Sequence, residues 1–439
     1  MQQFTIIGGR PLVGSVAASG AKNAALPILA ASILASEPVT VSRMPRVTDV
    51  YTMLRLLQSL GAPQSTISAC ATAGLSDSAV TIDPRTLTRA APAARYVRRM
   101  RASFCVLGPL LARHGRAVVP LPGGCRIGPR PVDLHLRGLA ALGADIRVVD
   151  GLVIARAARL RGARVSLIGP HGPTVTGTAN VLCAAVLARG ATIIEGAAIE
   201  PEITDLVRFL NSLGARIDGA GTAMLEIRGV EQLGGARHEL IADRIEAGTL
   251  LAAGLATCGR VTVERIDPNH LSAVLEAFAR MGAEIEVSVD RVTVSRRGRI
   301  HPINFTARPY PGVPTDLQAQ LMALAVLADG TSQIADSVFP ERFAHVQQLR
   351  RMGAQSTQRA NGVTIRGVQQ LHGARVVASD LRASAALVLS ALAARGTSHV
   401  ERLHHLDRGY ERLEDKLWSL GANIRRESIP SRDVLLAAR

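Results

Sequence analysis

The residue best placed to do chemistry is a cysteine on a loop rich in glycine and proline. Residues 121–135 read Leu-Pro-Gly-Gly-Cys-Arg-Ile-Gly-Pro-Arg-Pro-Val-Asp-Leu-His, so Cys125 stands among three glycines and three prolines, just before a helix-like pattern. A thiol on such a loop can be brought over a bound molecule and withdrawn again. Three other cysteines lie in apolar runs that are typical of buried structural residues: Cys105, Cys183 and Cys258. We therefore predict that Cys125 is the reactive thiol.

The basic residues indicate an anionic ligand. The net charge is +16, and of 51 basic residues only two are lysines, which makes Lys22 in Ser19–Asn23 an unusual choice for this chain. Cations also stand at predicted helix starts, where the helix dipole disfavours them. Together they predict an anion pocket assembled from both halves of the chain: Lys22, Arg101, Arg130, Arg342, Arg382 and Arg408. The acidic residues at such starts, Asp49, Asp133 and Asp205, fit helix caps equally well.

Composition argues against several other classes of protein. The arginines are scattered and aromatic residues make up 3%, which disfavours a nucleic-acid partner. The apolar runs are far shorter than the roughly 20 residues of a bilayer span, and the first residues do not form a signal peptide. Five cysteines without paired spacing favour a reducing, cytoplasmic setting, and no histidine or cysteine spacing indicates a metal site. The oligomeric state is not readable from these patterns.

An internal repeat organises the chain. A Leu/Met-Gly-Ala tripeptide ends an amphipathic helical pattern at six places that are 68 to 82 residues apart, and each is followed by strand-like alternation: Gly61, Gly143, Gly214, Gly282, Gly353 and Gly421. Each unit has a second helical pattern that is apolar nearly all round and must be buried. These patterns cover residues 22–35, 98–114, 177–189, 244–258, 315–329 and 381–395.

Six similar units of about 70 residues predict an α/β protein with two domains of three units each. The small-residue helices are expected inside the sheets, and the cleft between the domains is the default site.

Five motifs resemble those of the UDP-N-acetylglucosamine enolpyruvyl transferase family, within the enolpyruvyl transferases. They occur in the family's order over about residues 4–425: residues 19–27 (SGAKNAALP), 121–135, 314–320 (PTDLQAQ), 379–384 (SDLRAS) and 407–412 (DRGYER). The resemblance implies the two-domain inside-out α/β barrel. It places residues 22–240 in the first domain and residues 1–21 plus 241–439 in the second.

The resemblance also implies a reaction. The 3-hydroxyl of UDP-N-acetylglucosamine attacks C2 of phosphoenolpyruvate and phosphate leaves, in the first committed step of peptidoglycan synthesis, with no cofactor beyond the co-substrate. By motif position, Cys125 would donate a proton, form a covalent phosphoenolpyruvate adduct and be the residue that fosfomycin alkylates. Asp316 would be the base, and Lys22 and Arg408 would join these two as catalytic groups.

The same motif positions imply the binding residues. Phosphoenolpyruvate and the departing phosphate would contact Lys22, Asn23, Arg130, Arg342, Arg382 and Arg408. The UDP-sugar would contact Arg101, Arg130, Pro131, Val132, Asp133, Leu134, Thr174, Val175, Thr176, Gly177, Asp316 and Val338. His135 and His405 would support these groups or simply pack.

Other interpretations stay open. Thr48 and Ala179 depart from the family pattern near the acceptor side, so the same transfer onto another nucleotide or sugar nucleotide in a secondary-metabolite pathway is the main alternative. A basic nucleic-acid-binding repeat protein and an inactive paralogue are more distant alternatives.

Overall fold

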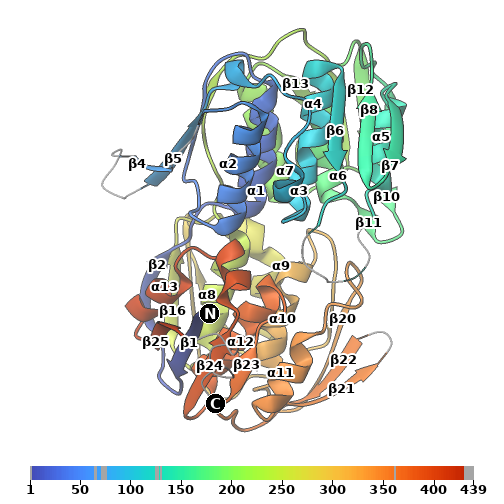
Figure 1. The fold of residues 1–439 in the computed structure, drawn as a ribbon. Coiled ribbons are helices and arrows are strands. Elements are labelled where there is room, and N and C mark those ends of the chain that lie inside the picture. The colour runs from blue at the N-terminus through green and yellow to red at the C-terminus, as the bar shows by residue number, and fades with distance from the viewer. Residues whose placement is uncertain are drawn as a thin grey trace, which may run out of the picture. The chain divides into compact units, whose positions relative to one another are not determined.

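The chain folds into two compact units, each with its own hydrophobic core. The computed structural model describes residues 2–63, 67–70, 77–123, 128, 131–359 and 362–429. One unit consists of residues between Ser19 and Ile241, and the other of residues up to Ala18 and from Ala242 onward. The buried apolar residues fall into two separate clusters that follow this division. The labelled elements of both units can be followed in Figure 1.

The unit between Ser19 and Ile241 has three main sheets around a group of helices. Its α-helices are α1 (Lys22–Ala31), α2 (Thr48–Leu60), α3 (Ala94–Val97), α4 (Leu107–His114), α5 (Asp133–Ala141), α6 (Val175–Ala185) and α7 (Pro201–Ser212). Short 3-10 helices are η1 (Ser32–Leu34), η2 (Pro84–Thr86) and η3 (Arg101–Val106).

The strands of this unit pair within its own segment. The first sheet has the order β15 (Ala236–Glu239), β3 (Val39–Ser42), β5 (Asp77–Ile82), β4 (Ser68–Cys70). The second has the order β6 (Arg116–Pro120), β8 (Leu152–Arg156), β7 (Asp145–Val149). The third has the order β13 (Arg216–Asp218), β14 (Met224–Arg228), β12 (Ala191–Glu195), β9 (Arg164–Ser166), beside a small β10 (Ile168–Gly169) and β11 (Gly172–Pro173) pair.

The other unit repeats this plan. Its helices are α8 (Arg244–Ala256), α9 (Ser272–Arg280), α10 (Thr315–Ala325), α11 (His345–Arg351), α12 (Leu381–Ala393) and α13 (Leu413–Ser419), with the 3-10 helices η4 (Pro268–Leu271) and η5 (Leu403–Arg408). Its first sheet has the order β17 (Ala283–Val287), β18 (Arg291–Arg296), β16 (Arg260–Glu264), β2 (Val13–Ala17). Its second sheet has the order β19 (Phe305–Ala307), β20 (Thr331–Asp336), β22 (Gly362–Arg366), β21 (Gln355–Arg359).

The third sheet of this unit joins the two ends of the chain. Its order is β23 (Arg375–Val377), β24 (Thr397–Glu401), β1 (Gln2–Ile7), β25 (Asn423–Ser428). Strand β1 pairs antiparallel with both β24 and β25, from Gln3 opposite Glu401 and Gln2 opposite Ser428. In the sheet of β19 to β22, the inner position that corresponds to β1 is occupied by β22, which lies between β20 and β21 and follows both in the chain. The N-terminal segment therefore completes a sheet whose other strands come from the end of the sequence.

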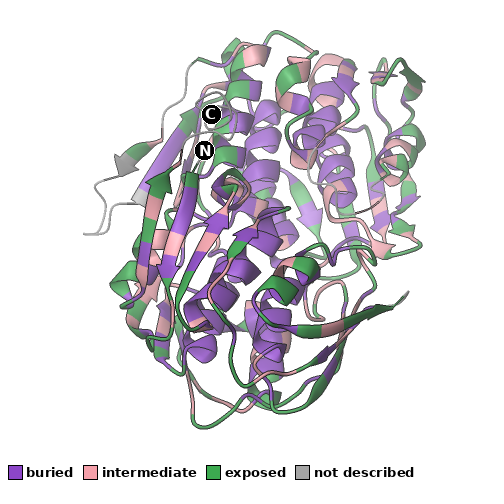
Figure 2. Ribbon diagram, turned by 60° about the horizontal axis from the view of Figure 1, so that its bottom comes forward, coloured by how far each residue is buried: buried purple, intermediate pink, exposed green. Residues whose placement is uncertain are grey.

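The apolar helices lie at the centre of each unit, as their lack of a polar face predicts. All of α8 and residues Leu381–Leu392 of α12 are buried. Figure 2 shows buried residues concentrated on such helices, while the strands carry many exposed positions. The predicted helix ends are also confirmed, because all six repeat glycines have φ between 91° and 118°, the left-handed conformation that ends a helix and favours glycine.

Several predicted local features are wrong. The single helix expected over residues 98–114 is divided into η3 and α4, where Pro109 in the first turn of α4 lacks the N–H for a continuous ladder. Arg408 is the last residue of η5 instead of a helix start, and Arg342 lies three residues before α11. Cys258 is exposed, because α8 ends at Ala256 and the chain turns through Cys258 at a φ of 53° into β16.

Candidate functional site

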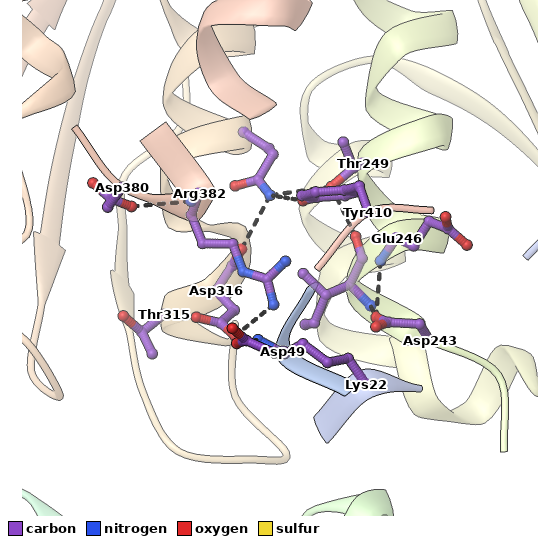
Figure 3. Close-up of polar contacts among 12 residues, drawn as sticks. Lys22, Asp49, Asp243, Glu246, Thr249, Thr315, Asp316, Asp380, Arg382 and Tyr410 are labelled. Carbon is purple, nitrogen blue, oxygen red and sulfur yellow. Dashed lines mark hydrogen bonds and ion pairs between the residues drawn. The ribbon is translucent and has the colours of Figure 1, made fainter. Parts of the chain in front are cut away.

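Asp316 is the centre of a charged cluster in the unit that contains α10. Its Oδ1 accepts a hydrogen bond from Nη1 of Arg342 at 2.8 Å, and its Oδ2 accepts one from Nη2 of Arg382, also at 2.8 Å. The side chains of Arg342 and Arg382 are 8% and 2% exposed, whereas that of Asp316 is 26% exposed. Figure 3 shows the bond from Arg382 to Asp316. Two of the predicted phosphoenolpyruvate-binding arginines thus meet the predicted base.

The buried arginines have capacity for a further anion. Nε of Arg342 and both Nε and Nη1 of Arg382 have no hydrogen-bond partner within the described ranges, although these atoms are buried. Burial alone would lower the pKa of Arg382, but the Asp316 carboxylate outweighs it and raises that pKa, so the guanidinium stays charged. A buried cation with unpaired donors is a suitable partner for phosphate or carboxylate oxygens.

Backbone caps fix the helices that carry this cluster. Asp380 caps α12, with its Oδ1 accepting from the backbone N–H of Arg382 at 2.9 Å and of Ala383 at 3.1 Å. At the start of α10, Oγ1 of Thr315 donates to Asp336 at 2.6 Å and accepts from Arg342 at 3.1 Å.

The same Asp336 also orders the segment that contains Val338. Its Oδ1 accepts from the backbone N–H of Val338 at 2.9 Å and of Phe339 at 2.8 Å. Burial raises the pKa of Asp336, although these hydrogen bonds oppose the shift. The predicted sugar-contact residue Val338 is therefore tied to the same carboxylate as the start of α10.

Lys22 forms a second polar pair, in the unit between Ser19 and Ile241. It is the first residue of α1, and its Nζ lies 3.4 Å from Oδ2 of Asp49 in the first turn of α2. The side chains are 10% and 6% exposed, so this is a nearly buried ion pair. Asn23 follows Lys22 on α1 and is partly buried. Asp49 thus contacts a predicted catalytic lysine.

His135 connects the start of α5 to the turn that begins α6. Its Nε2 lies 3.2 Å from Oγ1 of Thr176, and its Nδ1 lies 3.0 Å from Nδ2 of Asn180. The Asn180 amide is oriented by a bond from its Nδ2 to the carbonyl of Phe104 at 2.9 Å and one to its Oδ1 from the N–H of Gly108 at 2.5 Å. Because Asn180 donates to Nδ1, the proton of the neutral imidazole is on Nε2 and is donated to Thr176.

The surroundings of His135 keep it uncharged. Burial lowers the pKa of His135 to about 3, and the charge of Arg101 acts in the same direction. Thr174 caps α6 by accepting from the N–H of Gly177 at 3.2 Å, so the predicted sugar-contact stretch 174–177 forms a defined turn beside His135.

The remaining predicted UDP-sugar residues lie at the start of α5. Arg101 donates through Nη2 to the carbonyl of Pro131 at 2.6 Å. Pro131 and Asp133 are exposed, and Val132 and Leu134 are partly buried. This segment is therefore held by backbone contacts while its side chains remain accessible.

Cys125 and Arg130 lie outside the described residues, so their predicted roles stay predictions. Arg408 is partly buried at the end of η5. His405 on the same turn stacks on His404 with ring centroids 4.1 Å apart, and burial, followed by the charge of His404, lowers its pKa to about 4. His405 is therefore neutral near pH 7.

Sequence reasoning missed three residues behind Asp316. Nε2 of Gln320 lies 3.1 Å from the Asp316 carbonyl oxygen, 3.1 Å from Oγ1 of Thr249 and 3.1 Å from the hydroxyl of Tyr410. Gln320 and Tyr410 both stand in the motifs at 314–320 and 407–412, and a glutamine within an apolar helix is the signal that could have identified the network.

Comparisons with known proteins identify the family of this chain. The family model described as EPSP synthase (3-phosphoshikimate 1-carboxyvinyltransferase) matches residues 6–417. A UDP-N-acetylglucosamine 1-carboxyvinyltransferase from Methylacidiphilum infernorum is 47% identical over 426 residues, covering 97% of this chain and 99% of the relative. The chain therefore belongs to the enolpyruvyl transferase family, a family of transferases.

Solved structures show the same fold. The enolpyruvyl transferase NikO from Streptomyces tendae has a TM-score of 0.86 with 28% identity, over 98% of this chain and 99% of that one. An EPSP synthase from Acinetobacter baumannii has a TM-score of 0.73 with 18% identity, over 98% of this chain and 100% of that one. The predicted inside-out α/β barrel of six repeated units is thus confirmed as the fold class.

The described part of the chain has neither a membrane-spanning type of helix nor a cluster of metal-ligand side chains. None of the helices there combines the length and apolar character that crossing a membrane requires. No cluster of three or more histidine, cysteine, aspartate or glutamate residues suitable for a metal ion occurs in that part of the chain.

Proposed function

We propose that this protein transfers the enolpyruvyl group of phosphoenolpyruvate to the 3-hydroxyl of UDP-N-acetylglucosamine and releases inorganic phosphate. The observation that carries the proposal is the Asp316 carboxylate held between two buried arginines with unpaired donors. The 47% identity to the Methylacidiphilum infernorum transferase supports this choice of donor and acceptor. The reaction is the first committed step of peptidoglycan synthesis and takes place in the cytoplasm.

The chemistry divides into an addition and an elimination. In the addition, the sugar oxygen bonds to C2 of phosphoenolpyruvate, its proton passes to Asp316, and C3 receives a proton from the Cys125 thiol. In the elimination, the Cys125 thiolate takes a proton back from C3, the bond from C2 to the phosphate oxygen breaks, and the double bond is restored as inorganic phosphate leaves. Cationic side chains stabilise the charge of the phosphoenolpyruvate carboxylate and of the leaving phosphate.

The binding groups follow the family motifs. Lys22, Asn23, Arg130, Arg342, Arg382 and Arg408 bind phosphoenolpyruvate, while Arg101, Val338 and residues 131–134 and 174–177 bind the UDP-sugar. An anion bound to the unpaired donors of Arg342 and Arg382 offsets part of the positive charge that these arginines present to Asp316. Asp316 is then less tightly held by cations and becomes a better proton acceptor. No cofactor takes part. The Cys125 thiol forms its covalent adduct by adding across the double bond of phosphoenolpyruvate, with sulfur bonding to C2 and the thiol proton passing to C3. The catalytic domains are residues 22–240 and residues 1–21 plus 241–439.

The test is phosphate release from phosphoenolpyruvate with UDP-N-acetylglucosamine, with UMP as a second acceptor and Cys125→Ala as the control variant. Release with UDP-N-acetylglucosamine that is lost in Cys125→Ala supports the proposal. Absence of release with either acceptor refutes it, and fosfomycin labelling of Cys125 followed by mass spectrometry tests the thiol separately.

The second candidate is the same transfer onto another nucleotide. Thr48 and Ala179, which depart from the family pattern near the acceptor side, favour keeping this alternative. Release with UMP and not with UDP-N-acetylglucosamine would select it, while the roles of Asp316 and Cys125 in the transfer would stay as proposed.

A further inference from the structure

Behind the Asp316 carboxylate, four side chains form a closed circuit of contacts. Arg382 holds Oδ2 of Asp316 at 2.8 Å, and its guanidinium carbon lies 5.5 Å from the centre of the Tyr410 ring. The hydroxyl of Tyr410 lies 3.1 Å from Nε2 of Gln320, and the same nitrogen donates to the Asp316 carbonyl at 3.1 Å. The circuit thus returns to the residue where it began (Figure 3).

Hydrogen bonds link Thr249, Tyr410 and Gln320. Oγ1 of Thr249 donates its only hydrogen to the carbonyl of Ile245 at 2.8 Å, so it accepts from the Tyr410 hydroxyl at 2.9 Å. Nε2 of Gln320 lies 3.1 Å from three acceptors, the Tyr410 hydroxyl, Oγ1 of Thr249 and the Asp316 carbonyl, and its two hydrogens are shared among them. Oε1 of Gln320 has no hydrogen-bond partner within the described ranges.

The side chains of the circuit are buried, except that of Asp316. Gln320, Thr249, Tyr410 and Arg382 are 1–2% exposed, whereas the Asp316 side chain is 26% exposed. Burial raises the pKa of Tyr410, so its hydroxyl keeps the proton that it donates to Thr249. Because these side chains are buried, removing one hydrogen bond of the network leaves a polar atom that solvent does not readily satisfy. Among these side chains, only that of Asp316 is accessible to solvent to a substantial extent.

We propose that Gln320 and Tyr410 are a positioning pair that fixes how the Asp316 carboxylate and the Arg382 guanidinium are presented to the substrates. Gln320 fixes the backbone of Asp316 at the first turn of α10. The hydroxyl of Tyr410 locks Gln320, and the ring of Tyr410 supports Arg382 through a cation–π contact. This inference rests on the proposed function for its kinetic readout.

The two parts of Tyr410 have separable effects. Tyr410→Phe keeps the ring against Arg382 but removes the bond to Gln320, so kcat should fall about 5- to 10-fold, as expected for one buried hydrogen bond. The KM for phosphoenolpyruvate should stay within about twofold. Tyr410→Leu also removes the ring, and the same KM should rise at least about fivefold because Arg382 loses its support.

The matched pair of variants is Gln320→Met and Gln318→Met. Both glutamines are on α10 and are at most 1% exposed, but the amide atoms of Gln318 have no hydrogen-bond partner within the described ranges. Gln320→Met should lower kcat about 10- to 100-fold, in line with the effect of a small displacement of a reacting group. Gln318→Met should leave kcat within about twofold. Equal losses in the two variants would overturn the proposal, because they would indicate a general packing effect.

A structural readout keeps this test separate from that of the proposed function. In crystals of Gln320→Met the distance from Oδ2 of Asp316 to Nη2 of Arg382 should exceed 3.5 Å, while in Gln318→Met it should stay near 2.8 Å. If the wild-type protein released no phosphate with any acceptor, the proposed function would fail, and these distances would still decide the positioning role. An unchanged distance in both variants refutes it.

Discussion

Replacing Asp316 by asparagine should destabilise the protein and at the same time create an anion site. The substitution keeps the shape of the side chain but leaves the buried guanidinium groups of Arg342 and Arg382 without their counter-charge. Removing one partner of a buried ion pair costs about 3–5 kcal/mol, and the 26% exposure of Asp316 favours the lower end, about 3 kcal/mol. For a unit of about 200 residues this corresponds to a fall in Tm of about 6–12 °C.

Phosphate should reverse much of this loss in the variant. Two unpaired arginines bind phosphate without competition from the carboxylate, so the affinity for phosphate should be at least about tenfold higher in Asp316→Asn than in the wild type. At a phosphate concentration of 100 times Kd, binding adds about 2.7 kcal/mol to the free energy of unfolding. The variant should therefore gain more in Tm from added phosphate than the wild type does, although it has lost its proposed base.

Thermal unfolding followed over a phosphate titration measures both effects. Asp145→Asn is the control, because Asp145 pairs with Arg147 at 3.6 Å on the surface and should contribute less than about 0.5 kcal/mol. The reasoning is refuted if phosphate raises the Tm of Asp316→Asn and of the wild type equally, or if Asp316→Asn unfolds at the wild-type temperature.

Three further predictions concern the unit that contains His135. Burial holds the pKa of His135 in the folded protein at about 3, below its ordinary value of 6.5, so the unfolded state binds the extra proton between these pH values. Stability should therefore fall as the pH drops from about 6.5 towards 3, and urea unfolding of His135→Gln should show a shallower pH slope. Asn180→Ala removes the partner of three buried groups and should lower the free energy of unfolding by about 3 kcal/mol in urea titrations. Gly138→Ala places a Cβ 2.4 Å from Cγ2 of Val181 and should lower the free energy of unfolding by about 1–3 kcal/mol. The control Gly234→Ala, whose Cβ has its nearest atom at 3.8 Å, should leave the free energy of unfolding nearly unchanged. An unchanged free energy of unfolding in Gly138→Ala would contradict this prediction.

Much of the fold could be predicted because its signals are local. The repeat glycines end helices wherever they occur, and the helices without a polar face are buried, as in α8. The motifs also brought out Asp316 and Arg382, and the cations at predicted helix starts brought out Arg342. The fold places these three residues together.

The features that sequence reasoning missed depend on distant partners. Gln320 meets Thr249 from 71 residues away and Tyr410 from 90 residues away, and no local pattern reports such pairing. Arg408 was expected at a helix start because charged residues follow a helical spacing there, but the turn closes as a 3-10 helix and α13 begins only at Leu413. Short 3-10 turns carry the same residue types as α-helix starts, so sequence alone did not separate them.

The pairing of β1 with β24 and β25 has a consequence for the order in which the protein is made. The strands of the unit between Ser19 and Ile241 find all their partners within that segment, so its sheets can close while the rest of the chain is still being synthesised. Strand β1 is made long before its partners in residues 397–428, which follow about 20–80 s later at about 5–20 residues per second. During that interval the first strand has unpaired backbone groups on both edges and an apolar face. A chaperone that covers the nascent N-terminus would therefore protect the segment that closes the last sheet.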